Sequence, residues 1–246
     1  MIEEIKSKNN SLIKYIYKLK NNSFSKSEKK FVIEGEHLCE MAGENLLFIL
    51  TEHKMDETRF PNQYIVTNEI LEKLSEGKSV ARIIGVCKYI ESYDKLSNFV
   101  LFLDDVQDPG NVGTIFRTAL GFKFKTIFVT PKTAYRYNSK VVQASQGSIF
   151  KLDLRNGNIS TLQELKKQGY KLIGTALREK TISLNDFRFN KNDKYAIILG
   201  NEGQGISLDI LDICDFTLKI NISDIESLNV AIAGAIIMNE VCNEGE

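Results

Sequence analysis

From residue 99 onward, the chain alternates short, almost wholly apolar segments with segments of helical periodicity. An apolar segment of this kind predicts a strand that is buried on both faces. Strands of this type, separated by helices, are typical of a parallel sheet that helices cover on both sides, so we predict an α/β fold. The predicted strands cover residues 99–103, 126–129, 148–152, 171–174, 195–199 and 216–220, and the predicted helices cover residues 112–120, 138–145, 160–168, 207–214 and 227–241.

The first 90 residues predict a second, smaller α/β domain. Residues 88–98 are mostly polar and lack periodicity, so we expect the boundary between the domains there. The predicted organisation is a domain over residues 1–90, a linker over 91–98 and a domain over 99–246. Within the first domain we expect helices over residues 10–20, 36–42 and 67–74, strands over 31–33, 46–51 and 82–88, and a polar loop over 23–30.

The composition excludes several classes of protein. With 43% hydrophobic and 26% charged residues, the chain of 246 residues is typical of a folded protein and not of a disordered one. No apolar run approaches the roughly 18–20 residues of a membrane span, and the N-terminus lacks the pattern of a secretory signal. The four cysteines are scattered and there are only two histidines, so we expect no metal site. We predict a cytoplasmic protein with reduced cysteines and no membrane partner.

Basic residues are concentrated near the N-terminus, although the chain as a whole has no net charge. Residues 1–30 contain eight lysines and three acidic residues. A local excess of positive charge is suited to binding the phosphate backbone of a nucleic acid. A solvated helix face explains the same pattern, so charge alone leaves both interpretations open.

Three predicted strands end in segments of unusual composition, at the edge of the sheet where α/β proteins bind their ligands. The first is DDVQDPGNVGTIFR, residues 104–117. A Pro-Gly turn leads to Asn111, which we expect to cap the next helix, and Gly113 would allow a close approach of the backbone. Arg117 then projects from the second turn of this helix. A well-capped loop with a surface arginine is the alternative interpretation.

The second segment is GNEGQGIS, in which Gly200, Gly203 and Gly205 connect a buried strand to a helix. Glycines at such a position usually bring backbone amides close to a ligand. The spacing is not that of a dinucleotide fingerprint, and no Gly-Lys-Ser/Thr sequence follows. A nicotinamide-dependent oxidoreductase and a P-loop enzyme are therefore not supported.

The third segment is INISDIESLNV, residues 220–230, a polar loop that leads into the last helix. Ser227 or Asn229 is expected to begin that helix, since both are good capping residues. The helix is rich in Ala, Gly and Ile, which predicts that it is largely buried or packs closely against another helix.

Together, the three segments resemble the three signature motifs of the SpoU (TrmH) family of RNA ribose methyltransferases, in the SPOUT superfamily. Their order and spacing match over residues 99–243, and the N-terminal sequence FVIEG also resembles the family's substrate-binding domain. The matching residues are Asn111, Gly113 and Arg117 in the first motif, Glu202 in the second, and Ser227 and Asn229 in the third.

The resemblance implies methyl transfer from S-adenosyl-L-methionine to a ribose 2′-hydroxyl of RNA. It also implies a deep trefoil knot in the C-terminal domain, and a homodimer in which the Asn and Arg of the first motif face the RNA of the other subunit. The third loop is one residue shorter than the family pattern, which leaves open whether Ile220 or Ile222 contacts the adenine. The implied cofactor-binding residues are Thr175, Ala176, Leu199, Gly200, Asn201, Gly205, Ile220, Ile222 and Leu228.

The implied catalytic residues are Asn111, Arg117, Glu202, Ser227 and Asn229. Methyl transfer is an in-line displacement, so positioning supplies much of the acceleration. Arginines hold their proton up to about pH 12, which makes a role as base costly. We therefore expect Arg117 to clamp phosphate and hydroxyl and to stabilise the developing alkoxide. The other side chains would orient the hydroxyl and Arg117, and Glu202 could instead hold the loops.

Ribosomal RNA is the expected substrate and transfer RNA the second choice, because a lysine-rich additional domain suits a large structured RNA. Two other interpretations stay open. One is a relative that methylates a base, and the other is a non-catalytic RNA-binding protein of the same fold.

Overall fold

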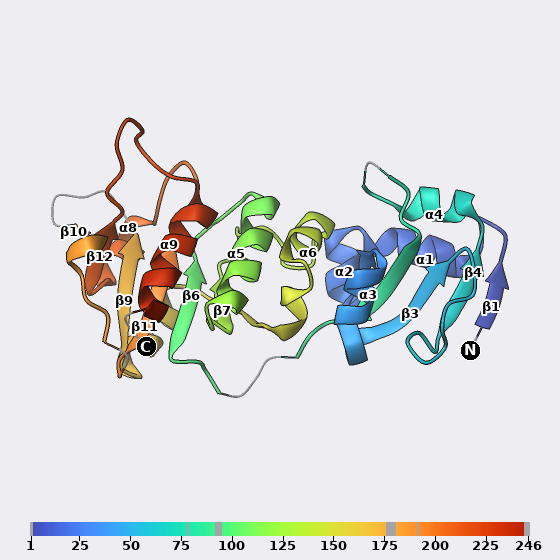
Figure 1. Ribbon diagram of the computed structural model, residues 1–246, viewed down its shortest axis with the longest axis horizontal. Helices are drawn as coiled ribbons and strands as arrows, with labels where there is room; N and C mark the ends of the chain where they lie inside the picture. Colours follow the sequence, from blue (N-terminus) through green and yellow to red (C-terminus); the bar gives the residue numbers. More distant parts are fainter. Residues whose placement is uncertain (1, 78, 92–94, 176–180, 191, 244–246) are drawn as a thin grey trace. The chain divides into compact units, whose positions relative to one another are not determined.

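The computed structural model describes residues 2–77, 79–91, 95–175, 181–190 and 192–243. The chain divides into two compact units, both drawn in Figure 1. Unit 1 consists of Met1–Glu91 together with Tyr137–Phe150, and unit 2 consists of Ser92–Arg136 and Lys151–Glu246. The segment Tyr137–Phe150, which the sequence assigned to the second domain, therefore packs with the first.

Unit 1 is built on a mixed sheet with the strand order β1-β4-β3-β5-β2. The β1/β4 and β4/β3 pairs are parallel, and β5 is antiparallel to both β3 and β2. The strands are β1 (Ile2–Ile5), β2 (Lys30–Glu34), β3 (Leu46–Thr51), β4 (Gln63–Val66) and β5 (Ile83–Lys88). The helices are α1 (Ser11–Leu19), α2 (Asn22–Glu28), α3 (Glu36–Ala42), α4 (Asn68–Leu74) and α6 (Ser139–Ser145), with 3₁₀ turns at Gly43–Asn45 and Ser148–Lys151.

Both faces of this sheet are buried. One face packs against the apolar sides of α1 and α4, where Ile13, Ile16 and Ile70 are fully buried. On the other face, Phe31 of β2 stacks on Tyr137 with 4.4 Å between ring centroids and on Phe150 at 6.0 Å. These aromatic contacts bury both ends of the inserted segment and so explain why it belongs to unit 1.

Unit 2 contains a sheet with the strand order β10-β12-β9-β11-β6-β7-β8, and all of its described pairs are parallel. The predicted α/β class with a parallel sheet is confirmed. The strands are β6 (Phe99–Leu103), β7 (Thr126–Val129), β8 (Asp153–Asn156), β9 (Tyr170–Thr175), β10 (Ile182–Ser183), β11 (Lys194–Leu199) and β12 (Phe216–Lys219). The helices are α5 (Pro109–Gly121), α7 (Ile159–Lys167), α8 (Leu208–Ile213) and α9 (Val230–Asn243), with a 3₁₀ turn at Leu184–Asp186.

Helices cover both faces of the unit 2 sheet. Phe102 and its neighbours on one face form a buried cluster with side chains of α7 and α8. On the other face, α5 and α9 lie side by side (Figure 1). The close packing predicted for the last helix is seen at Gly234, where an added Cβ would lie 2.7 Å from Leu199 Cδ1. Because the strands are parallel, their carboxyl ends share one edge of the sheet, and the loops at that edge carry the three motifs.

Two segments differ from the prediction. Residues 23–30 were expected to be a loop, but α2 forms there because Asn21 caps it and Phe24 packs edge-on against Tyr15 at 5.7 Å. Residues 148–152 were expected to be a strand, but they form a 3₁₀ turn, and β8 begins only at Asp153. Ile149, Phe150 and Leu152 of that segment are buried without strand pairing, and Phe150 stacks against Phe31.

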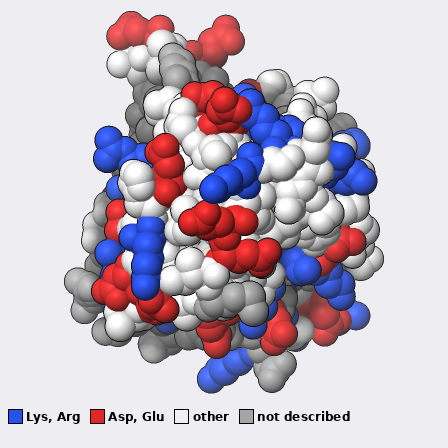
Figure 2. All heavy atoms as spheres, turned by 90° about the vertical axis from the view of Figure 1, so that its right-hand side faces the viewer, with Lys and Arg blue, Asp and Glu red and all other residues white. Residues whose placement is uncertain are grey.

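On the face that Figure 2 shows, basic and acidic side chains are interspersed, and no uninterrupted positive patch is seen there. Lys8 pairs with Glu69 at 2.9 Å, and Lys20 lies 3.8 Å from Glu76. Lys14 and Lys18 are exposed on α1 and have no ion pair with any described residue. In the described part of the chain, no helix is long and apolar enough to cross a membrane.

Candidate functional site

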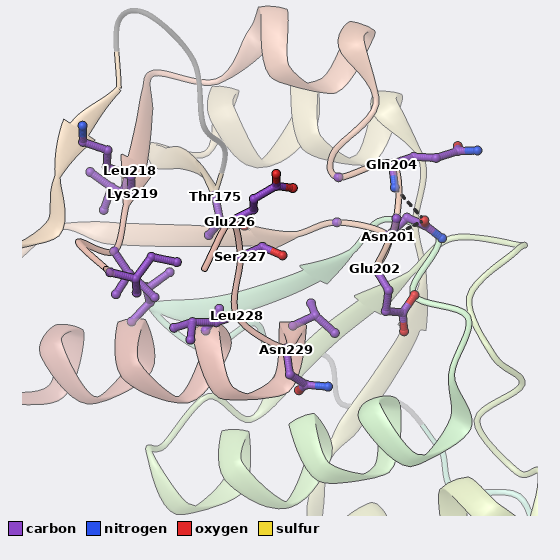
Figure 3. Close-up of a pocket in the computed structure, with 18 residues that line it drawn as sticks. Thr175, Asn201, Glu202, Gln204, Leu218, Lys219, Glu226, Ser227, Leu228 and Asn229 are labelled. Atoms are coloured by element: carbon purple, nitrogen blue, oxygen red, sulfur yellow. Dashed lines mark hydrogen bonds between the residues drawn. The ribbon is translucent and has the colours of Figure 1, made fainter. Parts of the chain in front are cut away.

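A cavity of about 490 Å³ opens at the carboxyl ends of β9, β11 and β12, beside the first turns of α9 (Figure 3). Part of its lining is apolar, and part consists of backbone and polar side chains from the loops that follow β11 and β12. The apolar lining residues include Leu218, Ile220, Ile222, Leu228 and Ile237, and the polar ones include Thr175, Asn201, Glu202, Gln204, Lys219, Glu226, Ser227 and Asn229.

The loop after β11 turns back sharply on itself. Asn201 and Gly205 exchange two backbone hydrogen bonds of 3.0 Å, and the Asn201 Oδ1 atom accepts bonds from the amides of Gly203 and Gln204. A Cβ at Gly200 would lie 2.3 Å from the Gly205 carbonyl carbon, so no side chain fits there. Gly205 has a φ of +72°, which favours glycine. The backbone geometry therefore explains two of the three glycines that the sequence singled out.

The loop after β6 holds the loop after β11 in place. The Asn201 Nδ2 atom donates a 2.9 Å hydrogen bond to the Asp105 carbonyl oxygen. The buried Asp104 carboxylate accepts bonds from the Ser207 amide at 2.8 Å and from its hydroxyl at 2.9 Å. The first two motifs, about 95 residues apart, are thus joined at both ends of the glycine-rich loop.

Glu202 is the main anchor between these loops. Its carboxylate accepts bonds from the amides of Gln107 and Asp108 at 3.1 and 3.0 Å, and from the Asn111 Nδ2 atom at 3.0 Å. Partial burial by itself raises the pKa of the Glu202 carboxyl, but the hydrogen bonds from Asn111 and the backbone outweigh it and the pKa lies below its usual range. Glu202 is therefore an ionised hydrogen-bond acceptor at neutral pH.

Asn111 lies one turn further into the helix than expected. Asp108 caps α5, since its side chain accepts a bond from the Asn111 amide at 2.8 Å. The prediction that Asn111 is the cap was wrong, because a side chain one turn inside the helix cannot reach its own first amides. Its side chain is instead free to donate to Glu202 and to accept a 2.9 Å bond from the Asn229 Nδ2 atom.

Asn229 caps α9 and connects the third motif to the first. Its Oδ1 atom accepts bonds from the amides of Ala231 and Ile232 at 2.9 and 3.3 Å. This satisfies two of the helix's free amides and leaves the Nδ2 atom for Asn111. Of the two residues expected to begin this helix, the structure selects Asn229.

The structure brings four of the five predicted catalytic residues together. Glu202, Ser227 and Asn229 line the cavity, and Asn111 is bonded to two of them. Arg117 is exposed on α5, does not line the cavity, and has no hydrogen-bond or ion-pair partner among the described residues. Arg117 is six positions after Asn111 in the helix, which places it about 9 Å along the axis and on another face.

Most of the predicted cofactor-binding residues line the cavity. They are Thr175, Gly200, Asn201, Gly205, Ile220, Ile222 and Leu228. Leu199 lies outside the lining, because its buried side chain packs against Gly234, and its carbonyl oxygen accepts a bond from the Asp104 amide. Ala176 lies outside the described residues. Both Ile220 and Ile222 line the cavity, so the choice between them for contact with an adenine stays open.

Sequence reasoning missed several lining residues. Glu226 directly precedes the third motif's serine, and Leu218 and Lys219 end β12. Ile237 lies two turns inside α9 and reaches the cavity only because this helix packs beside the loops. The position of Leu218 and Lys219 at a strand's carboxyl end is the signal that could have identified them.

The lining fits S-adenosyl-L-methionine. An aromatic base needs flat apolar walls, and the side chains of Leu218, Ile220, Leu228 and Ile237 supply apolar surface. The loop Gly200–Gly205 exposes backbone groups, and Ser227 and Asn229 add polar groups on the side that joins α5. The volume lies within the usual range of a small-molecule site, about 300–1,000 Å³.

Comparison with known proteins gives a family match. The family model described as the SpoU rRNA Methylase family matches residues 98–239. A protein of Bacillus subtilis (strain 168), named 23S rRNA (guanosine(2553)-2'-O)-methyltransferase RlmP, is 32% identical over 246 residues, covering 96% of this chain and 98% of that protein.

Solved structures agree with the fold. A protein of Porphyromonas gingivalis assigned to the TrmH family of RNA methyltransferases has a TM-score of 0.84 and 27% identity, over 94% of this chain and 96% of that one. An AdoMet-bound rRNA methyltransferase from Sinorhizobium meliloti has a TM-score of 0.86 over 98% of this chain and 97% of that one. At 20% identity, the second likeness concerns the fold alone.

Proposed function

The chain belongs to the SpoU rRNA methylase family, and on this basis we propose that it transfers a methyl group from S-adenosyl-L-methionine to a ribose 2′-hydroxyl of ribosomal RNA. The observation that carries the proposal is the side-chain connection Glu202–Asn111–Asn229 beside a cavity of the right size and lining. Only the combination of all three motifs produces this connection.

S-adenosyl-L-methionine supplies an electrophilic methyl group on a sulfonium when it is bound. Thr175, the loop Gly200–Gly205 and the apolar residues of the third loop would hold it, with Ile220 and Ile222 both available to the adenine. The trefoil knot implied by the family resemblance stays a prediction. It would fix these loops relative to one another without requiring the cofactor to order them.

The protein's contribution to methyl transfer is positioning and electrostatic stabilisation. Asn111 and Asn229, which Glu202 helps to hold in place, orient the ribose hydroxyl together with the Ser227 hydroxyl. Arg117 holds phosphate and stabilises the alkoxide that develops as the hydroxyl loses its proton. Glu202 acts mainly by holding the loops, because its two carboxylate oxygens are already occupied as acceptors.

Arg117 acts across a homodimer in this proposal. Arg117 does not line the cavity of its own chain. In the proposed dimer, each site therefore receives the arginine of the other subunit. Ile225 and Ile232 support an interface near the third motif, since these apolar side chains are 59% and 52% exposed. Residues such as Lys14 and Lys18 of unit 1 would bind the RNA backbone as well.

The substrate is 23S ribosomal RNA in this proposal, because the Bacillus subtilis relative, which acts on that RNA by its name, matches nearly the whole chain. Because ribosomes are in the cytoplasm, the enzyme is cytoplasmic in this proposal.

The test is methyl transfer from labelled S-adenosyl-L-methionine to unmodified 23S rRNA, 16S rRNA and a tRNA pool, with the site mapped by 2′-O-methyl-sensitive reverse transcription. An Asn229→Asp variant is the control. A product on tRNA alone, on a base, or on none of these RNAs would overturn the proposal.

A further inference from the structure

Glu226 lines the cavity, but none of the three motif matches gives it a role. It lies in the loop between β12 and α9, directly before Ser227. Its side chain is exposed, and it forms no hydrogen bond or ion pair with any described residue. Figure 3 labels Glu226 together with Ser227 and Thr175 among the residues that line the cavity.

The charges in the lining single out this residue. Among the described lining residues, Lys219, Glu202 and Glu226 carry charge. The carboxylate of Glu202 is occupied by three hydrogen bonds to Asn111 and the loop amides. In Figure 3, Lys219 lies at the far end of the labelled residues, away from Glu202 and Asn229. In the described lining, Glu226 therefore has the one carboxylate without a hydrogen-bond or ion-pair partner, and it directly precedes Ser227 of the third motif.

We propose that Glu226 compensates the positive sulfonium charge of S-adenosyl-L-methionine in this cavity, an inference that rests on the proposed function. The cofactor carries one net positive charge at neutral pH, from the sulfonium and a zwitterionic amino acid. The three charged side chains of the described lining sum to one negative charge. Opposite charges at short range attract, and the attraction near a protein surface is a few-fold stronger than in bulk water.

This role has a distinctive consequence for ligand preference. S-adenosylhomocysteine has the same adenosine and amino-acid parts but a neutral sulfur. A carboxylate beside the sulfur therefore favours the cofactor over the demethylated product. Stabilisation of the bound cofactor alone tightens its binding without accelerating the transfer step. Glu226 is thus a positioning and specificity residue, not a catalytic one.

The test is calorimetric titration of S-adenosyl-L-methionine, S-adenosylhomocysteine and sinefungin, which has an amine-bearing carbon in place of the sulfonium, into wild type and Glu226→Gln. We expect the variant to lose about tenfold in affinity for the two cationic ligands, about 1.4 kcal/mol, and much less for S-adenosylhomocysteine. Single-turnover methyl transfer at saturating cofactor should stay within a few-fold of wild type. Asp224→Asn removes the same charge from an exposed position outside the lining, and should bind all three ligands normally.

Equal losses of affinity for all three ligands would overturn the inference. They would show that Glu226 contacts the adenosine or amino-acid part that the ligands share, or that it is needed for the folding of the loop. Unchanged affinities together with a changed RNA affinity would also overturn it, and would show that Glu226 binds RNA. Failure of wild type to bind S-adenosyl-L-methionine would be a different result, since it removes the proposed function itself.

Discussion

The Asn229 Nδ2 atom donates a 2.9 Å hydrogen bond to the Asn111 Oδ1 atom, 118 positions earlier in the chain. Each amide has its other end committed, Asn229 to the first amides of α9 and Asn111 to Glu202. The orientation of both amides is therefore determined, because reversing either one would place two donors or two acceptors against each other. A polar connection of this kind holds α5, α9 and the glycine-rich loop in one arrangement.

Asn229→Asp should separate the capping role of this residue from its role in the connection. Aspartate keeps the oxygen that caps α9 but places an acceptor against the Asn111 Oδ1 atom, so the melting temperature should fall less than in Asn229→Ala, which loses the cap as well. It loses the donor to Asn111, so the methyl-transfer rate should fall at least about tenfold, near 1.4 kcal/mol. The measurements are thermal unfolding and single-turnover transfer at saturating cofactor. A rate equal to wild type would show that the hydrogen bond has no part in the reaction.

Arg117→Ala should fold normally, since an exposed helix side chain rarely contributes much to stability. Its single-turnover rate should fall at least about a hundredfold, or 2.7 kcal/mol, and Arg117→Lys should recover little because a point charge cannot replace a bidentate fork. Lys125→Ala, which removes an exposed cation close to the end of the same helix, is the control.

The proposed dimer makes Arg117 testable in a second way. Mixed dimers of an Arg117→Ala subunit and an Asn229→Asp subunit contain one site with an intact cavity and a partner's intact arginine. Methylation should reappear on mixing if Arg117 acts across the interface. Inactive mixtures, despite exchange of subunits, would place the arginine's action within its own chain.

Gly200→Ala should destabilise the protein and weaken cofactor binding, because the added Cβ would lie 2.3 Å from the Gly205 carbonyl carbon. The displaced backbone should cost about 1–3 kcal/mol of unfolding free energy. Gly203→Ala is a matched control in the same loop, since its nearest neighbour would be a side-chain oxygen 3.7 Å away. Denaturant unfolding and cofactor titration of both variants provide the comparison, and equal behaviour of the two would contradict the geometry.

The Glu202 carboxylate should make the stability depend on pH in acid. Its pKa is lowered in the folded protein, so its contribution is complete above the ordinary glutamate value of 4.5 and is lost as the pH falls through the folded value. The difference in unfolding free energy between wild type and Glu202→Gln should therefore shrink on going from pH 6 to pH 3. A difference that stays constant over this range would mean that the carboxylate's hydrogen bonds do not stabilise the fold.

Lys14 and Lys18 should increase RNA affinity by binding phosphates. Both are exposed on α1, and removing each phosphate-binding ammonium should reduce the slope of log K against log salt by about 0.7–0.9. The double alanine variant is compared by filter binding at several salt concentrations with Lys54→Ala, whose ammonium pairs with Glu57 in the same unit. An unchanged slope would assign α1 no role in RNA binding. Point variants are preferable to deletion of residues 1–90, because the deletion would remove Phe31, the ring against which Tyr137 and Phe150 stack.

Local patterns in the sequence determined most of the elements and the place of the site. Apolar segments such as β6 and β11 are buried on both faces and were predicted to the residue or nearly so. The glycines after β11 indicated a loop with close backbone packing, and Gly200 has it. These features follow from periodicity and from the lack of a side chain, which are properties of a short stretch of chain.

The tertiary structure alone decided which partners those residues have. Asn111 could be interpreted as a cap, but Asp108 takes that position. The side-chain amide of Asn111 instead forms hydrogen bonds with Glu202 and Asn229, which come from two other loops. The segment Tyr137–Phe150 likewise belongs to unit 1 because aromatic rings from distant parts of the chain bury it. Hydrogen bonds and packing between residues about a hundred positions apart leave no periodic trace in the sequence. The hydrogen bonds between the motifs exist only once the strands of unit 2 have brought their carboxyl ends to the same edge of the sheet.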